Sequence, residues 1–140
     1  MGKTIEEIKM FDESSYTYTF TEDATEMFGK LTGDLNPQHM DEQYAADSIF
    51  GRRVVHGMFV GSMFSKIFGL DYPGVGSIYI KQSLKFKKPV FFGDTIEAKV
   101  IVKEINVERN RVIFNCISTN QHQEVVIEGE AEIMPPKKRG

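Results

Sequence analysis

The sequence has little cysteine and no excess of basic charge. Its 140 residues include one cysteine, Cys116, and 17 Lys and Arg stand against 20 Asp and Glu, for a formal charge of −3. Since Cys116 lies in an apolar run, we expect it to be a small buried hydrophobe in a reducing compartment rather than half of a disulfide. A chain with this charge lacks the basic face that attracts nucleic acid, so no nucleic-acid partner is expected.

Long hydrophobic runs are also missing. No stretch approaches the roughly 18 uninterrupted apolar residues of a membrane-spanning helix, and residues 1–11 lack the apolar segment of a signal peptide. We therefore expect a soluble, cytoplasmic protein without a membrane partner. With 41% hydrophobic residues the chain suits one domain, residues 1–140, and its basic tail at residues 135–140 is expected to be solvated.

One amphipathic helix is predicted near the N-terminus, after a short strand at residues 15–20. Thr21 can cap its start, and Gly33 suits a left-handed residue at its end. A shorter helix is expected over residues 42–46, capped by Asp41. The expected buried stripe of the first helix consists of apolar residues three or four positions apart: Ala24, Met27, Phe28 and Leu31.

The most apolar stretch, residues 57–70, is predicted to form another helix. Apolar residues occupy most of its sides, so we expect it to be buried nearly all round. Gly57, Gly61 and Ser65 recur at every fourth position. They leave one side without bulk, where a backbone or a slender ligand could approach closely.

After residue 76 the chain alternates apolar and polar residues, which is the period of β-strands with one core face. The connections at residues 89–94, 106–110 and 120–123 are too short for parallel crossovers. The sequence therefore predicts an α+β fold. Its curved, mostly antiparallel sheet wraps around the apolar helix, because that helix alone is apolar enough to cover the core face of the sheet.

Residues 33–39 (GDLNPQH) contain the strongest candidate for chemistry. Residues five apart diverge by about 140° in a continuous helix, but Pro37 lacks an N–H and pushes Asn36 out of the α region. The chain must therefore turn, which lets Asp34 and His39 face one spot. A carboxylate and an imidazole with a pKa of about 6.5 can act as an acid–base pair at neutral pH. The alternative is a helix cap and a surface histidine beside an ordinary turn, and spacing alone favours neither.

The start of the apolar helix offers a second candidate. The first amides of a helix have no internal partner, so the Gly57 N–H could bind an oxyanion. For the His56 ring we expect only packing and a local hydrogen bond. A metal site at Asp34, His39 and Asp41 has weak support, since no second histidine lies at a suitable spacing.

Several basic residues could meet the anionic groups of a ligand, although such residues are more often solvated. They are Arg52, Arg53, Lys81, Lys85, Lys87 and Lys88.

Several blocks of sequence carry a resemblance to a known family. They are residues 31–41 (LTGDLNPQHMD), 44–46 (YAA), 50–51 (FG), 54–58 (VVHGM), 73–79 (PGVGSIY) and 86–95 (FKKPVFFGDT). They resemble the MaoC-like (R)-specific enoyl-CoA hydratases, and the first block is the specific one. Its one departure is Gln38, where an apolar residue is usual.

The resemblance implies a hot-dog fold, a lyase of fatty acid metabolism and a homodimer with active sites near the subunit interface. The implied reaction is the reversible syn hydration of a trans-2-enoyl-CoA thioester to an (R)-3-hydroxyacyl-CoA, without a metal or another cofactor. Asp34 and His39 match the pair that holds one water, and Gly57 matches the oxyanion amide. Asn36 matches an asparagine that supports the loop, and Ser65 matches a serine near the pair.

In this mechanism Asp34 takes a proton from the water that adds to C3, and His39 gives a proton to C2. Three alternatives remain open. A 3-hydroxyacyl-carrier-protein dehydratase of fatty-acid synthesis would use the same pair in the opposite direction, whereas a hot-dog thioesterase usually relies on a carboxylate without the paired histidine. The domain could also be a non-catalytic subunit that binds acyl thioesters, although both reacting side chains are present.

Overall fold

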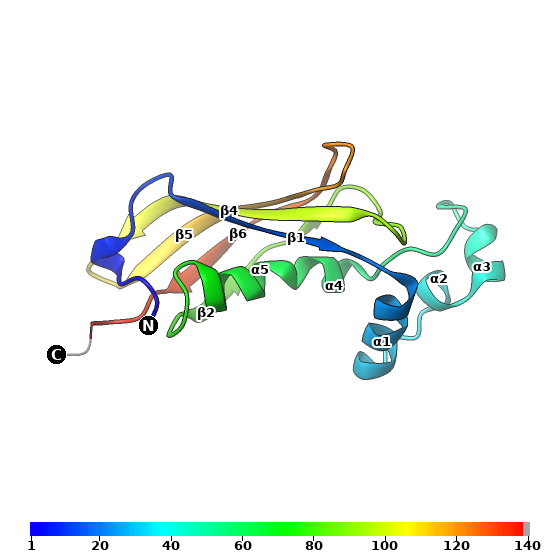
Figure 1. Cartoon of the computed structure of the whole chain (residues 1–140), viewed down its shortest axis with the longest axis horizontal. Helices are drawn as coiled ribbons and strands as arrows, with labels where there is room; N and C mark the ends of the chain where they lie inside the picture. The colour runs from blue at the N-terminus through cyan, green and yellow to red at the C-terminus, as the bar shows by residue number, and fades with distance from the viewer. Residues whose placement is uncertain (139–140) are drawn as a thin grey trace.

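A curved sheet is the largest element of the computed structural model, which describes residues 1–138 (Figure 1). Its six strands run in the order β1-β4-β5-β6-β2, β3 pairs with β6 off this path, and all neighbouring strands are antiparallel. The predicted antiparallel sheet is confirmed, and the last two residues of the basic tail lie outside the described residues. The strands are β1 (Glu13–Thr19), β2 (Ile78–Gln82), β3 (Lys85–Phe86), β4 (Thr95–Asn106), β5 (Arg111–Thr119) and β6 (Val125–Met134).

A rod of helical turns runs along the inner face of the sheet (Figure 1). It consists of α4 (Gly57–Gly61), α5 (Met63–Lys66) and the π-helical turn η2 (Ile67–Asp71). The predicted sheet around one apolar helix is therefore confirmed. Within residues 1–138, no helix combines the length and the apolar character needed to cross a bilayer. The core contains the rod residues Val60, Phe64, Ile67 and Phe68, and the strand residues Ile96, Ala98, Val100, Val102, Val112, Phe114 and Cys116.

Cys116 is buried in this core, as expected. Burial raises the pKa of its thiol to about 12. The thiolate is the reactive form of cysteine, so Cys116 acts as a packing residue.

The prediction that the rod is buried nearly all round is wrong. Met58 is 64% exposed and Leu70 is 65% exposed, and Ser62, Ser65 and Gly69 are also exposed between them. The sheet covers one side of the rod and leaves the opposite side open. Apolar residue types alone do not show which faces of a helix are covered within the same chain.

The remaining helices lie together beyond one end of the sheet (Figure 1). They are α1 (Glu22–Thr32), α2 (Pro37–Met40) and α3 (Glu42–Ala46), while the short 3₁₀ helix η1 (Ile5–Glu7) lies near the N-terminus. The predicted ends of α1 are confirmed, since the Thr21 hydroxyl accepts a hydrogen bond from the Ala24 N–H at 3.1 Å and Gly33 has a φ of 80°.

The predicted buried stripe of α1 is only partly correct. Ala24 and Phe28 are half-buried, but Met27 is 71% exposed and Leu31 is 87% exposed. Because α1 projects beyond the sheet, only one narrow side of it finds a partner within the chain.

Candidate active site

The turn after α1 separates Asp34 from His39, as the sequence predicts. The Asn36 side chain accepts a hydrogen bond from the Gln38 N–H at 3.0 Å and caps α2, and Pro37 occupies the first position of this single-turn helix. Pro favours that position because its missing N–H would have no partner there. Asp34 thus precedes the turn, whereas His39 lies on α2.

The His39 ring is oriented by the main chain of a distant segment. Its Nδ1 lies 2.8 Å from the Val54 carbonyl oxygen. A carbonyl only accepts hydrogen bonds, so we assign the hydrogen of the neutral ring to Nδ1. The second nitrogen, Nε2, keeps its lone pair and can accept a hydrogen bond or a proton.

The surroundings of His39 favour the neutral imidazole. Burial lowers its pKa below the ordinary value of about 6.5, and the nearby His56 lowers it further, because two charged rings at this distance would repel. The Val54 carbonyl and the Asp34 carboxylate act in the opposite direction without outweighing burial. At neutral pH, His39 therefore offers a basic nitrogen.

His56 packs as expected, but its hydrogen-bond partner is distant in sequence and not local. It is 1% exposed, its Nε2 lies 2.9 Å from the Asp34 main-chain oxygen, and its ring centroid is 4.0 Å from that of His39. One potential ligand atom from each of Asp34, His39 and His56 falls within 4.8 Å of the others. The sequence offers no signal for this convergence, because the partner of His56 is a main-chain carbonyl.

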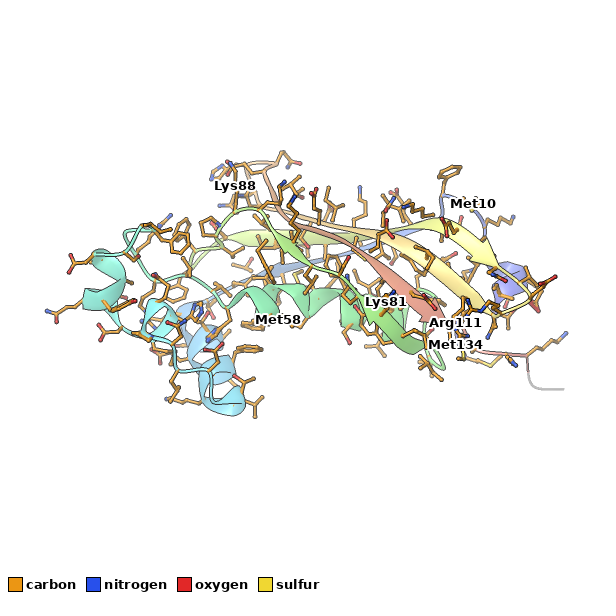
Figure 2. All side chains as sticks on the ribbon, turned by 180° about the vertical axis from the view of Figure 1, so that it is seen from behind. Met10, Met58, Lys81, Lys88, Arg111 and Met134 are labelled. Atoms are coloured by element: carbon orange, nitrogen blue, oxygen red, sulfur yellow. The ribbon has the colours of Figure 1, made fainter. Side chains whose placement is uncertain are left out.

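A cavity of about 480 Å³ opens beside these groups. Asp34, Asn36, His39 and Gly57 line its polar side. Met58 also lines it, and Figure 2 shows this residue on the side of the rod that the sheet leaves open. The apolar lining consists of Phe50, Val54, Val55, Met58, Val60, Phe86, Pro89, Val90 and Ile127.

The start of the rod lies in this cavity. Among the described residues, the Gly57 N–H has no hydrogen-bond partner, as expected for the first amide of a helix. A Cβ at Gly57 would come within 2.7 Å of the Phe86 ring, so a larger residue would force the ring to move. Ser65 lies on the exposed side of the rod and does not line this cavity.

The donor groups suit a water molecule better than a metal ion. One nitrogen of His56 contacts the Asp34 carbonyl, and the other is buried away from solvent. Only the Asp34 carboxylate and His39 Nε2 are therefore free to act as metal ligands. Zinc sites in proteins usually supply three or four such donors. Two hydrogen-bond acceptors beside one cavity match the two hydrogens of water.

The basic residues have different surroundings. Arg53, which was expected to be solvated or to meet a ligand, is 4% exposed and forms ion pairs with three glutamates. Its Nε donates to the His39 carbonyl at 2.7 Å, and its Nη atoms pair with Glu22, Glu26 and Glu42 at 2.8, 3.3 and 3.4 Å. It therefore ties α1, α2 and α3 together.

Two of the predicted basic residues lie at the cavity. Lys87 and Lys88 line it, and they also pair with Glu128 and Glu124. Figure 2 shows Lys88 at the outer edge of the molecule, above the sheet. A role for these lysines toward an anionic ligand stays a prediction.

This architecture, an antiparallel sheet curved around one helical rod, defines a hot-dog protein, and an aspartate and a histidine lie beside the start of its rod. The chain belongs to the family described as MaoC like domain, whose model matches residues 5–126. The resemblance drawn from the sequence is therefore confirmed.

Known relatives support the same class. The (R)-specific enoyl-CoA hydratase of Rhodospirillum rubrum is 41% identical over 133 residues, which cover 95% of this chain and 92% of the relative. A mitochondrial 3-hydroxyacyl-[acyl-carrier-protein] dehydratase of Arabidopsis thaliana is 35% identical over 132 residues, which cover 92% of this chain and 78% of the relative. Both names describe hydro-lyases, so the predicted class of enzyme is confirmed.

A solved structure confirms the fold. The R-hydratase PhaJ1 from Pseudomonas aeruginosa aligns with a TM-score of 0.91 at 35% identity, covering 98% of this chain and 88% of that protein. The hot-dog fold predicted from the sequence is therefore the fold of this chain.

Proposed function

We propose that this protein catalyses the reversible syn hydration of trans-2-enoyl-CoA thioesters to (R)-3-hydroxyacyl-CoA thioesters. One observation carries the proposal: Asp34 and His39 line the same mostly apolar cavity as the Gly57 amide. An enoyl thioester needs an acid–base group at its double bond, a donor for its carbonyl oxygen and an apolar space for its acyl chain. The names of the relatives support this substrate class.

The proposed reaction uses one water between Asp34 and His39. The water donates one hydrogen bond to the Asp34 carboxylate and the other to His39 Nε2. As its oxygen bonds to C3, His39 takes a proton from it, and the electrons of the double bond move toward the thioester oxygen. His39 then returns that proton to C2, so both additions occur on one face of the substrate.

This proton path differs from the one expected from the sequence, in which Asp34 takes the proton and an imidazolium supplies another. The lowered pKa of His39 makes the imidazolium scarce at neutral pH. In the proposed path Asp34 instead orients the water and stabilises the charge that His39 acquires during the reaction.

The other predicted site residues keep supporting roles in the proposal. The Gly57 N–H binds the negative charge that builds on the thioester oxygen, an interaction of a kind that contributes about 2.7–4 kcal/mol in other enzymes. Asn36 fixes the turn through its cap on α2. Ser65 lies on the open side of the rod, two turns beyond Met58, so its proposed contact with the site requires a second chain.

We propose that this second chain is another copy of the protein. Strand β2 forms one end of the sheet order, and its apolar residues Ile78, Tyr79 and Ile80 are 52%, 39% and 43% exposed. Phe86 on β3 and Met58 on the rod are 51% and 64% exposed. An exposed, apolar edge strand favours pairing with another chain.

A direct assay tests the proposed reaction. The enoyl-thioester absorbance of crotonyl-CoA should fall on addition of the protein, and chiral analysis should identify the (R)-3-hydroxy product. Release of free CoA would support a thioesterase instead. Tight binding of crotonyl-CoA without a change in absorbance would support a non-catalytic subunit.

A dehydratase acting on carrier-protein thioesters is the second candidate, supported by the Arabidopsis relative. Turnover of matched CoA and carrier-protein thioesters separates the two functions. We expect a higher kcat/KM for the CoA substrate.

A further inference from the structure

The proposed reaction gives no role to His56, although this side chain is buried against both reacting residues. Its ring centroid lies 4.0 Å from that of His39 and 4.8 Å from that of Phe28. Its Nε2 contacts the main chain of Asp34. We propose that His56 is a positioning residue, which holds Asp34 and His39 at the separation that one shared water requires. This inference rests on the proposed function, because it concerns the geometry of that pair.

The Asp34 segment depends on His56 for its attachment. Residues 33–36 belong to no regular element, and their other hydrogen bonds are local, such as that from Leu35 N–H to the Gly33 oxygen at 3.0 Å. Within the described residues, the contact from His56 Nε2 is the only hydrogen bond that ties residues 33–36 to a segment beyond residue 40. Without it, the carboxylate would be carried by a loop linked only to neighbours in sequence.

His56 itself is firmly held. Its carbonyl accepts hydrogen bonds from the Phe59 and Val60 amides at 3.0 and 3.1 Å, and the preceding Val55 N–H donates to the Val90 oxygen at 2.8 Å. The ring thus extends from the start of the rod, beside the core. A side chain fixed in this way holds the loop at a defined position relative to the core.

One donor atom accounts for the proposed role. The Asp34 carbonyl only accepts hydrogen bonds, so Nε2 of His56 carries the hydrogen. Among the described residues, the buried Nδ1 has no hydrogen-bond partner. The position therefore needs an N–H donor at the reach of Nε2, and it does not need a second ring nitrogen or a group that exchanges protons.

Three substitutions separate these requirements. His56→Gln keeps an amide N–H close to the position of Nε2, whereas His56→Leu has similar bulk and no donor. His56→Asn stays polar, but its shorter amide ends near the position of Nδ1. Steady-state kinetics with crotonyl-CoA on the full chain, together with circular dichroism and thermal unfolding of each variant, measure the outcome.

We expect His56→Leu and His56→Asn to lower kcat by about 10²-fold, the loss typical of a misplaced reacting group, with KM changed far less. His56→Gln should recover most of the kcat. If His56→Leu does not fold, the comparison of His56→Asn with His56→Gln carries the same prediction.

Two results would overturn the positioning role while leaving the proposed function intact. One is a folded His56→Leu or His56→Asn variant with the kcat of the wild type. The other is a His56→Gln variant as slow as His56→Asn, since the imidazole itself would then be required. A wild-type protein that hydrates no enoyl thioester would overturn the proposed function, and the positioning role with it.

Discussion

Each histidine of the site has one ring nitrogen engaged by a main-chain carbonyl. The Val54 oxygen holds Nδ1 of His39 at 2.8 Å, and the Asp34 oxygen holds Nε2 of His56 at 2.9 Å. The remaining nitrogen determines what each ring can do. That of half-buried His39 is free for a water, whereas that of His56 is sealed from solvent.

Removal of either reacting group should abolish most activity. We expect Asp34→Asn and His39→Ala each to lower kcat/KM for hydration of crotonyl-CoA by about 10²–10⁴-fold. Both positions are at least partly accessible to solvent, so the thermal unfolding midpoint should change little. Asp47→Asn and His122→Ala, which change exposed residues elsewhere, are the matched controls. Near-normal hydration by either active-site variant would refute the assignment of the pair.

The pH dependence of hydration distinguishes the two proton paths. A neutral His39 acts as the base in the proposed path, and burial lowers its pKa. The value of kcat/KM should therefore rise as the pH increases through this lowered pKa, below about 6.5, and should be level at neutral pH. If kcat/KM instead falls between pH values of about 5.5 and 7, the imidazolium is the reacting form, as the sequence-based mechanism requires.

The convergence of Asp34 and His39 could be predicted from the sequence because Pro37 forces a turn between the two side chains. The geometry brings Asp34 and His39 to one cavity, although their roles stay predictions. His56 could not be found in this way. Its partner is the carbonyl of a residue 22 positions away, and a main-chain acceptor leaves no mark in the residue types.

At the scale of the elements, Arg53 holds together the helices α1, α2 and α3 at one end of the molecule. Its guanidinium is buried, whereas Glu22, Glu26 and Glu42 are 55%, 39% and 73% exposed. The exposed ends of these pairs contribute little by themselves. The hydrogen bond from Arg53 to the His39 carbonyl is partly buried and links the cluster to the site.

Substitution of Arg53 should destabilise this end of the molecule. Arg53→Met leaves the His39 carbonyl without its charged donor, and we expect a loss of about 1.5–3 kcal/mol in the free energy of unfolding. Urea denaturation measures this loss. Arg52→Met is the control, because Arg52 is exposed and lies over the Phe91 ring. Equal stability of the two variants would contradict the proposed linkage.

The element boundaries were well predicted where a cap or a strict alternation marks them. Thr21 and Gly33 bound α1, and β4 and β5 alternate between core and surface. The exposed faces of α1 and of the rod were not predicted. Apolar residues predict a buried face, but residue types alone do not show whether that face is covered within the chain.

At the scale of the whole molecule, the apolar edge strand β2 is exposed, and this exposure is the basis for the proposed homodimer. A charge on this edge should prevent pairing. We expect Ile80→Lys to halve the molar mass measured by light scattering and to reduce hydration activity, since Ser65 would lose its place beside the site of the other copy. Val107→Lys, at the 63% exposed turn between β4 and β5, is the control. An Ile80→Lys variant that remains a dimer would rule out this interface.

The prediction that residues 1–140 form one domain stays a prediction.

The central claim is that one water, held on one side of the cavity, supplies both the hydroxyl group and the new hydrogen. Hydration of crotonyl-CoA in D₂O, followed by NMR of the product, tests it most directly. We expect a (3R)-hydroxy product that carries a single deuterium at C2, added to the same face as the hydroxyl. Deuterium on the opposite face, or a (3S) product, would contradict it.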